Sequence, residues 1–374
     1  MGAARRIKKK YPNHRVQSYK NDVLMPGMVN VHTHLEIPPL LDTVRARTFP
    51  EWIINLIRAK KSLSVQDYKR TAKRNIENLI QYGTTTVGEI CTHGVSPATL
   101  NEAGLRAVVY QEIISMDPHR PFIPSSADCS RPLSRITSGF SPHSPYTISE
   151  AVLRGICNIS REKGIRLAMH IAESRDETRL LQGKRTGLHE LYHLAEWDLS
   201  WAPKGLSSIE YLGRIGMLTC HLLAVHVVQV TEKDIRLIKK SKVPIGHCPR
   251  SNKETGVGKM PLEKFLNAGI TVGLGTDSLA SSPSLNLWDE LRYAFKIHRR
   301  NGITAEDLFR LATIGGAKAL GLEKEIGTLE VGKKADIIVV PMPANNTGDI
   351  YFDLLRETKS CIMMMVNGKI LNKV

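Results

Sequence analysis

Five residues that bind metals or carry protons stand at the ends of short apolar runs. The segment VNVHTH ends in His32 and His34, and LAMHIAES contributes His170 and, three residues later, Glu173. Asp277 follows the run TVGLGT. Three imidazoles and one carboxylate suit Zn²⁺, with Fe²⁺ as the alternative. The pattern predicts one divalent ion, bound by His32, His34, His170 and Asp277.

Each of these signals also has a purely structural explanation. A buried His often does no more than pack in a core, and a Thr-Asp pair often caps a helix. However, residues i and i+2 of a strand point to the same side, so one ion can take both His32 and His34. The occurrence of four potential ligands at three strand ends therefore favours a metal site.

A site of this composition activates water. A divalent ion lowers the pKa of water towards ~7, which makes hydroxide available at neutral pH to attack an electron-poor ring carbon. Glu173 is expected to carry protons to the ring nitrogen and to the leaving amine, and Asp277 to accept the proton of the water. His226, which ends LLAVH, is expected to donate a hydrogen bond to the attacking oxygen. The alternatives are a carboxylate at a helix N-terminus for Glu173 and a packed imidazole for His226.

The elements that would position these side chains alternate between strands and helices. Amphipathic stretches at Pro50–Tyr82, Ser149–Lys163 and Thr231–Lys240 are typical of helices. Eight units of this kind predict an α/β fold, a (β/α)8 barrel of the TIM type with its catalytic groups at the C-terminal ends of the strands. The expected strands are Met28–His32, Thr84–Ile90, Arg106–Glu112, Gly139–Ser141, Arg166–His170, Leu222–His226, Val243–His247 and Thr271–Gly275.

The pattern changes after Leu322. The segments GTLEVGKKADIIVVPMP and CIMMMVNGKIL indicate short strands joined by turns. We therefore predict a small β side domain formed from both termini, residues 1–27 and 325–374, beside a barrel of residues 28–324.

Charge and composition exclude several functional classes. The net charge is +16, but the basic residues are dispersed, and the one tight run, Arg5–Lys10, has no interleaved aromatic residues on which bases could stack. No apolar run approaches the ~18 residues of a membrane span, and no apolar segment follows the basic N-terminus as in a secretory signal. The six cysteines form no CxxC pair, which is typical of reduced thiols. We expect a cytoplasmic protein with a small-molecule substrate and neither a nucleic-acid nor a membrane partner. The sequence leaves open whether the protein forms a homodimer.

Five motifs in order carry a resemblance to a known family. PGMVNVHTHLE, HIAES, HCPRSN, LGTDSLAS and GGAKALGLEKEIGTLEVGKKADIIVV resemble the amidohydrolase superfamily from Met25 to about Val340, and within it the adenosine-type, cytosine and triazine deaminases. The resemblance implies the four metal ligands named above, with Glu173 as the proton shuttle. The fourth expected strand has no lysine placed to bridge two metals after carbamylation, so one ion is expected.

The same resemblance implies a set of substrate contacts. His226 matches the strand-six His near the attacked carbon, and His143 in SPHSPYT matches a strand-four substrate loop. His247 and Asn252, both in HCPRSN, match the strand-seven loop. For His143 and His247 a packing role is an equal alternative.

The choice of substrate is less specific. HTHLE, FPEWIINLI, AVHVVQVT, HCPRSN and LWDELRYAF look most like aminodeoxyfutalosine deaminases, whose relatives deaminate S-adenosylhomocysteine and methylthioadenosine. The S-adenosylhomocysteine enzymes carry a ribose-binding acid on the helix after strand one. NLIRAKKSL has none, which leaves Glu36 to bind substrate hydroxyls or else to pair with an Arg. Arg58, Lys60 or Lys61 either meets a substrate carboxylate, such as a benzoate, or covers a solvated helix face.

We therefore expect a metal-dependent deaminase of an adenine-type nucleoside, with 6-amino-6-deoxyfutalosine as its substrate. The alternatives are an S-adenosylhomocysteine or methylthioadenosine deaminase and an aminohydrolase or chlorohydrolase of the triazine or guanine type. A scaffold without turnover is a third possibility, against which the intact set of metal ligands and Glu173 argues.

Overall fold

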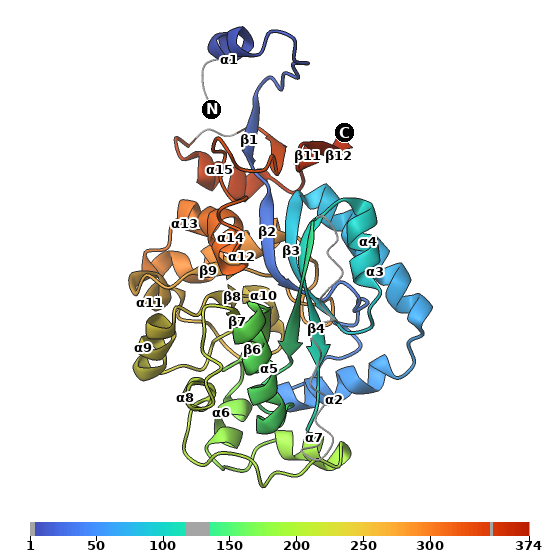
Figure 1. The fold of residues 1–374 in the computed structure, drawn as a ribbon, viewed down its shortest axis with the longest axis vertical. Coiled ribbons are helices and arrows are strands. Elements are labelled where there is room, and N and C mark those ends of the chain that lie inside the picture. Colours follow the sequence, from blue (N-terminus) through green and yellow to red (C-terminus); the bar gives the residue numbers. More distant parts are fainter. Residues whose placement is uncertain (1–3, 117–134, 345–346, 374) are drawn as a thin grey trace.

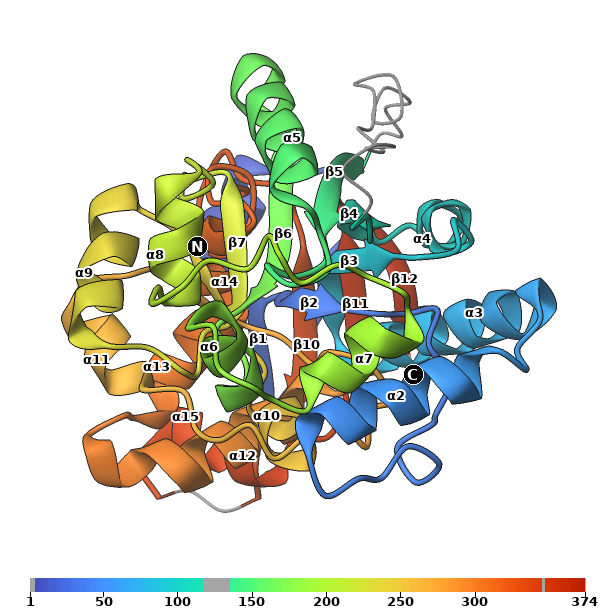
Figure 2. The same cartoon turned by 90° about the horizontal axis from the view of Figure 1, so that it is seen from below.

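Eight parallel strands form a barrel at the centre of the molecule (Figures 1 and 2). The computed structural model describes residues 4–116, 135–344 and 347–373. The strands pair in chain order, which confirms the predicted (β/α)8 architecture. They are β2 (Met28–Thr33), β3 (Thr84–Cys91), β4 (Arg106–Ile113), β5 (Ile136–Pro142), β6 (Arg166–Ile171), β7 (Leu222–His226), β8 (Ile245–His247) and β9 (Val272–Leu274).

The barrel closes where β2 meets the segment that follows β9. Thr33 and Asp277 form a parallel bridge, and the side-chain amide of Asn30 donates to Oγ1 of Thr276 across 2.8 Å. The backbone N–H groups of Thr276 and Asp277 both donate to the carbonyl of His32, each at 3.0 Å. Closure therefore brings the first strand and the last strand together, and Asp277 comes to lie beside His32.

Side chains fill the barrel below its C-terminal end. Val29, Val31, Tyr110 and Leu223 are among the buried residues of this inner core. Gly273 is required here, because a Cβ atom at its position would lie 2.3 Å from Cγ1 of Val31. The interior is thus a packed core, and the chemistry is confined to the open C-terminal ends of the strands.

Helices cover the outside of the barrel and the rim of its C-terminal end (Figure 2). They are α2 (Phe49–Lys60), α3 (Val65–Tyr82), α4 (Ser96–Ala103), α5 (Glu150–Lys163), α6 (Arg175–Leu181), α7 (Leu188–Leu194), α8 (Ser208–Arg214), α9 (Glu232–Ser241), α10 (Pro249–Glu254), α11 (Leu262–Asn267), α12 (Leu287–His298), η2 (Arg299–Asn301), α13 (Ala305–Arg310), η3 (Leu311–Gly315) and α14 (Gly316–Ala319). None of the described helices is long and apolar enough to span a membrane.

The stretch expected as a single helix over Pro50–Tyr82 is two helices. α2 ends at Lys60, and α3 begins at Val65 behind a capping box. In that box the Ser64 side chain accepts from the backbone of Asp67, while the Asp67 carboxylate accepts from the backbone of Ser64. The box starts a new helix, so α2 is free to pack beside α7 at the mouth of the barrel (Figure 2).

A second, antiparallel sheet joins the two ends of the chain, which confirms the predicted side domain. Its strands pair in the order β1 (Asp22–Pro26), β10 (Ile337–Pro341), β11 (Met363–Val366) and β12 (Lys369–Lys373), with α15 (Ile350–Glu357) between β10 and β11. The short exposed helix α1 (Ala4–Lys10) extends away from this sheet (Figure 1). The boundaries at residues 27 and 325 stay a prediction.

Candidate active site

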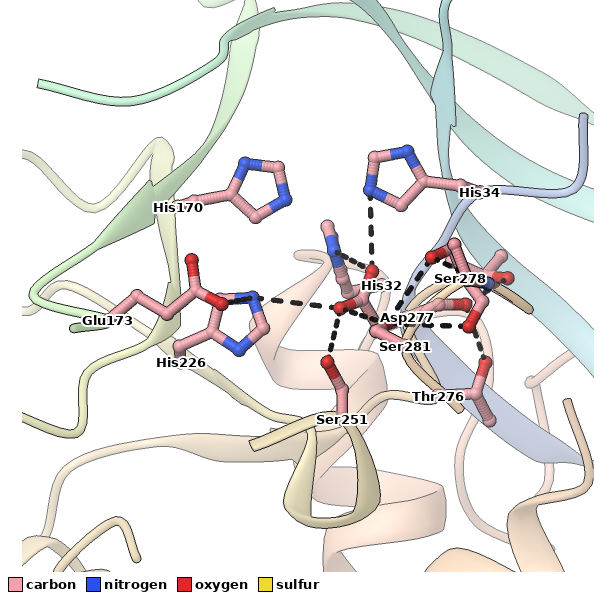
Figure 3. Close-up of polar contacts among 12 residues, drawn as sticks. His32, His34, His170, Glu173, His226, Ser251, Thr276, Asp277, Ser278 and Ser281 are labelled. Atoms are coloured by element: carbon pink, nitrogen blue, oxygen red, sulfur yellow. Dashed lines mark hydrogen bonds and ion pairs between the residues drawn. The ribbon is translucent and has the colours of Figure 1, made fainter. Parts of the chain in front are cut away.

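The four expected metal ligands converge at the C-terminal end of the barrel (Figure 3). His32 lies on β2, His34 directly after it, His170 on β6 and Asp277 after β9. One ligand atom from each side chain lies within 4.8 Å of the others, and all four residues are buried. The structure therefore brings together side chains that are up to 245 positions apart, 277 minus 32.

The chemistry of this donor set fits a divalent cation. Both ring nitrogens of His32 are buried without a hydrogen-bond partner among the described residues. Burial and the charge of His32 lower the pKa of His34 to about 4, and burial with the neighbouring imidazoles holds the pKa of His170 well below its usual value. His34 and His170 are therefore neutral at pH 7, the state in which His binds a metal. A bound cation would offset the free-energy cost of burying these lone pairs beside a carboxylate.

Asp277 presents one defined oxygen to this cluster. Its Oδ2 atom accepts hydrogen bonds from Ser251 at 2.5 Å and Ser281 at 2.9 Å. Its Oδ1 atom lies 3.5 Å from Nε2 of both His32 and His34. Burial alone would raise the pKa of Asp277, but the neighbouring His32, His34 and His226 hold it well below its usual range. The carboxylate is ionised, and Oδ1 is the oxygen available to a cation.

His143 shapes the cluster through its backbone. Nδ1 of His170 lies 2.8 Å from the carbonyl oxygen of His143, so Nδ1 carries the proton and Nε2 of His170 stays free for a metal. The His143 ring also lines the cavity in front of the cluster, where its Nδ1 lies 3.1 Å from Oγ1 of Thr147. The structure thus places His143 where a substrate contact was expected.

Glu173 faces the same cavity, while a second glutamate holds its backbone. The carboxylate of Glu177 accepts from the backbone N–H of Ala172 at 2.7 Å and of Glu173 at 2.9 Å. Ser174 caps α6, so the helix N-terminus is served by Ser174 and Glu177, and not by the Glu173 carboxylate. Burial, together with the charges of Asp277 and Glu177, raises the pKa of Glu173 well above its usual value. Burial therefore favours the acid form of Glu173 in the cavity.

His226 stands between Glu173 and Asp277. Its Nε2 lies 3.6 Å from Oε1 of Glu173 and 3.9 Å from Oδ2 of Asp277 (Figure 3). Its Nδ1 lies 2.8 Å from Oδ1 of Asn252. Burial lowers the pKa of His226 to about 4, and an amide oxygen only accepts, so the proton sits on Nδ1. Nε2 is then an acceptor, whereas the sequence led us to expect a donor.

Asn252 supports the site without lining the cavity. It lies on α10, directly after the Ser251 that holds Asp277. Its side chain contacts the ring of His226, an expected catalytic residue. Asn252 itself does not line the cavity.

Glu36 was expected to face the substrate, and the structure corrects this expectation. Its carboxylate accepts from the backbone N–H groups of the loop after β3, at Thr92 (3.1 Å), His93 (2.6 Å), Val95 (2.8 Å) and Ser96 (2.9 Å). The residue is buried and does not line the cavity. Strand alternation could not predict this, because β2 ends at Thr33 and Glu36 lies beyond it.

His247 also turns away from the cavity. Gly246 before it packs against Val31 inside the barrel, so alternation turns the His247 ring outward. There its Nε2 lies 3.2 Å from Nε2 of His298 on α12. The HCPRSN motif therefore serves the site through Ser251 and Asn252, and the expected substrate contact of His247 is not present in this structure.

The cavity in front of the cluster is mainly apolar. Five apolar side chains of α2 line it, and the aromatic ring of Trp197 and the side chain of Leu191 contribute as well. Two large apolar residues on its wall, Ile57 and Ile114, are exposed by 43% and 51%. The side chains from α2 are Phe49, Trp52, Ile53, Leu56 and Ile57.

Besides Glu173 and the metal cluster, Lys60 and Glu112 also line this cavity. Lys60 was one of three basic candidates; Arg58 and Lys61, the other two, are exposed and do not line the cavity. Glu112 was not recognised from the sequence, although the expected strand Arg106–Glu112 ends with it, and a strand end is where a barrel carries its functional groups.

Comparisons with known proteins agree with this geometry. Residues 23–371 match the model of the amidohydrolase family. The chain is 31% identical to a 5-methylthioadenosine/S-adenosylhomocysteine deaminase of Moorella thermoacetica, over 93% of this chain and 81% of that protein. It is 28% identical to an aminodeoxyfutalosine deaminase of Nitratiruptor sp., over 96% of this chain and 90% of that protein.

Solved structures share the fold. Helicobacter pylori aminofutalosine deaminase, in complex with methylthio-coformycin, superposes with a TM-score of 0.86 at 23% identity, covering 99% of this chain and 91% of that one. An adenosine deaminase of Xanthomonas campestris with bound zinc gives 0.79 at 24% identity, covering 94% and 81%. Together with the family match over residues 23–371, these findings show that the chain belongs to the amidohydrolase family and is an enzyme of the hydrolase class.

Proposed function

We propose that this enzyme hydrolyses the exocyclic amino group of an adenine-type nucleoside and that its preferred substrate is 6-amino-6-deoxyfutalosine, on the futalosine route to menaquinone. Glu173, with its raised pKa, and the neutral His226 lie beside a metal-binding cluster and support a deamination. Relatives named as deaminases of 5-methylthioadenosine, S-adenosylhomocysteine and aminodeoxyfutalosine support the nucleoside class.

The reaction adds water to the ring carbon that carries the amino group and releases ammonia. When bound, a divalent ion supplies hydroxide at neutral pH by lowering the pKa of water. Glu173 donates its proton to the ring nitrogen beside the attacked carbon. Of the two protons of the attacking water, one passes to the leaving amine and the other restores the acid form of Glu173. His226 accepts a hydrogen bond from the attacking water at Nε2 and so holds it on one face of the ring. The C–N bond breaks as the new C=O bond forms.

Zinc is the ion that we propose for the cluster. Three imidazoles and one carboxylate oxygen are a donor set that zinc binds. The zinc in the related fold of the Xanthomonas campestris enzyme supports this choice.

One observation carries the choice of substrate. Lys60 lines an otherwise largely apolar cavity wall on α2, and the exposed side chains of Ile57 and Ile114 lie on the same cavity. A substrate with an aryl carboxylate would cover both apolar residues with its ring and pair its charge with Lys60. Methylthioadenosine has no anion that could pair with Lys60, and adenosine has neither the carboxylate nor the aryl substituent that carries it.

Steady-state kinetics with the metal-replete enzyme test this proposal. Ammonia release should show a higher kcat/KM for 6-amino-6-deoxyfutalosine than for adenosine, methylthioadenosine or S-adenosylhomocysteine. If S-adenosylhomocysteine or methylthioadenosine is preferred by tenfold or more, the menaquinone assignment is wrong and the deaminase assignment survives. If guanine or a triazine is the only substrate turned over, the nucleoside class is wrong as well.

A double-substitution cycle then locates the carboxylate contact. Lys60→Met should lower kcat/KM about 10- to 100-fold for the carboxylate substrate. It should have little further effect on an analogue whose carboxylate is an uncharged amide, because the two changes remove the same interaction. Lys61→Met is the matched control, since Lys61 is exposed and does not line the cavity. Equal losses in the two lysine variants would contradict the assignment.

A further inference from the structure

A carboxylate outside the metal cluster lines the active-site cavity. Apart from Glu173 and Asp277, Glu112 is the only acidic side chain of the described residues on the cavity wall. It is the next-to-last residue of β4 and is half-buried. The chemistry proposed above uses Glu173 and Asp277 and leaves Glu112 without a role.

The orientation of Glu112 is fixed by the neighbouring strand. The hydroxyl of Thr92 donates to its Oε2 atom across 2.8 Å. Thr92 is itself held, because its backbone N–H donates to the buried Glu36 carboxylate at 3.1 Å. Among the described residues, no hydrogen bond reaches Oε1 of Glu112, which is therefore the oxygen left for a ligand.

Glu112 carries a charge in this position. Burial alone would raise its pKa, but electrostatic interactions with His143, His34 and Lys60 and the hydrogen bond from Thr92 together hold the pKa below its usual value. An ionised carboxylate accepts hydrogen bonds and donates none. It would repel the anionic end of a substrate and attract hydroxyl donors.

The neighbours of Glu112 define which part of a substrate lies next to it. Glu112 interacts electrostatically with His34, a cluster residue, and with Lys60 on α2. A nucleoside whose base faces the cluster and whose anionic substituent reaches Lys60 has its sugar between these two points. The sugar offers two adjacent hydroxyl donors, which match a carboxylate oxygen held in place.

We propose that Glu112, positioned by Thr92, determines specificity by accepting hydrogen bonds from the vicinal hydroxyls of the substrate's sugar. This inference rests on the proposed nucleoside deaminase function. It also gives two neighbouring acids different roles: Glu36 fixes the loop after β3, and Glu112 on β4 contacts the ligand.

Equilibrium binding provides a test that does not depend on turnover. The probes are inosine and 2′,3′-dideoxyinosine, which carry no amino group for the enzyme to remove, titrated calorimetrically into the metal-replete protein. The wild type should bind inosine about 10- to 100-fold more tightly than the dideoxy analogue, the usual scale of hydrogen bonds to a charged group. In Glu112→Gln this ratio should fall to within about threefold, and in Thr92→Val to an intermediate value, because the carboxylate is kept but no longer held. A wild type that binds the two probes equally, or a Glu112→Gln protein that keeps the full ratio, would overturn the inference.

Kinetics separate this inference from the proposed function. If ammonia release from ribonucleosides is absent while Glu112→Gln still abolishes the binding ratio, the deaminase proposal fails and the sugar contact stands. If deamination proceeds but Glu112→Gln reduces kcat/KM equally for ribo- and dideoxynucleosides, the sugar contact fails and the deaminase stands. Glu102→Gln is the matched control, because Glu102 is an exposed glutamate of α4 that does not line the cavity.

Discussion

Asn252 accepts a hydrogen bond from Nδ1 of His226 across 2.8 Å, and this contact fixes which ring nitrogen of His226 faces the reaction. With the proton on Nδ1, the lone pair of Nε2 points towards Glu173 and Asp277. The backbone of His226 has φ +72°, a left-handed conformation that costs about 1 kcal/mol or more for a residue other than glycine. The ring is thus held by its side-chain partner and by a strained strand end.

Replacing Asn252 should damage catalysis and leave metal and substrate binding largely intact. Asn252→Ala removes the acceptor for Nδ1, so the ring can rotate or adopt the other tautomer, and kcat should fall about 10- to 100-fold. KM should change by less than about threefold, because Asn252 does not line the cavity. Initial-rate kinetics and metal analysis of the purified variant measure both effects.

Asn286→Ala is the control for a merely structural effect of this substitution. Asn286 is also buried, and its side chain caps α12 by accepting from the backbone of Trp288. Its loss should lower the free energy of unfolding by about 0.5–2 kcal/mol and leave kcat unchanged. If both variants lose kcat equally, the positioning role of Asn252 is wrong.

Substitutions of Glu173 and Glu177 should have different effects, one on catalysis and the other on stability, although the two residues are only four positions apart. Glu173→Gln keeps the shape but loses the proton, so turnover should drop at least ~100-fold while the metal is retained. Glu177→Gln weakens the carboxylate contacts to the backbone of Ala172 and Glu173, so its main effect should be on thermal stability. A Glu173→Gln enzyme with a near-native rate would show that another group carries the proton.

Strand ends and alternation were sufficient to predict the metal cluster. His32 and His170 lie within strands, and the closure of the barrel places Asp277 beside them, so residue type and spacing carry the information. The same rule failed for Glu36, which lies after the end of β2, where the chain no longer alternates. It also failed for His247, because a glycine takes the inward position before it.

Two further features of the structure were not predicted, although the sequence contains a signal for each. Ser64 and Asp67 form the S-x-x-D pattern of a capping box, which marks the break between α2 and α3. Glu112 is the last residue of an expected strand, the same kind of position as that of the histidines at other strand ends. In contrast, the contact between Asn252 and His226 depends on how α10 packs against β7, which no local pattern encodes.

The cluster should hold about one equivalent of a divalent metal, with zinc as the expected ion. His170→Ala should lose most of it, because the ligand from β6 has no substitute among the described residues that converge there. Elemental analysis of purified wild type and variant measures the content directly. Active protein that contains no metal would overturn this prediction.

The buried pair of His247 and His298 predicts a loss of stability in acid. Burial and the charge of Lys259 lower the pKa of His298 to about 4, and burial with the charge of His298 keeps the pKa of His247 well below its usual value. The folded protein therefore holds both rings neutral in a range where the unfolded chain, with a His pKa of ~6.5, binds protons. Stability must then fall as the pH drops from about 6.5 towards 4.

Substituting His298 should remove part of this acid sensitivity. For a pKa of about 4 in the folded state, His298 costs the wild type about 2 kcal/mol of unfolding free energy between pH 7 and pH 5. His298→Gln can still hydrogen-bond to His247 but does not titrate, so its loss over the same interval should be smaller by about that amount. Glu263, whose Oε2 lies 3.9 Å from Nδ1 of His298, is the acid that could offset the effect by pairing with a protonated ring. Chemical denaturation of both proteins at the two pH values decides the matter. Equal losses of unfolding free energy in the two proteins would contradict the prediction and would mean that Glu263 compensates for the proton on His298. The kcat of His298→Gln at pH 7 should match that of the wild type, because neither His247 nor His298 lines the cavity.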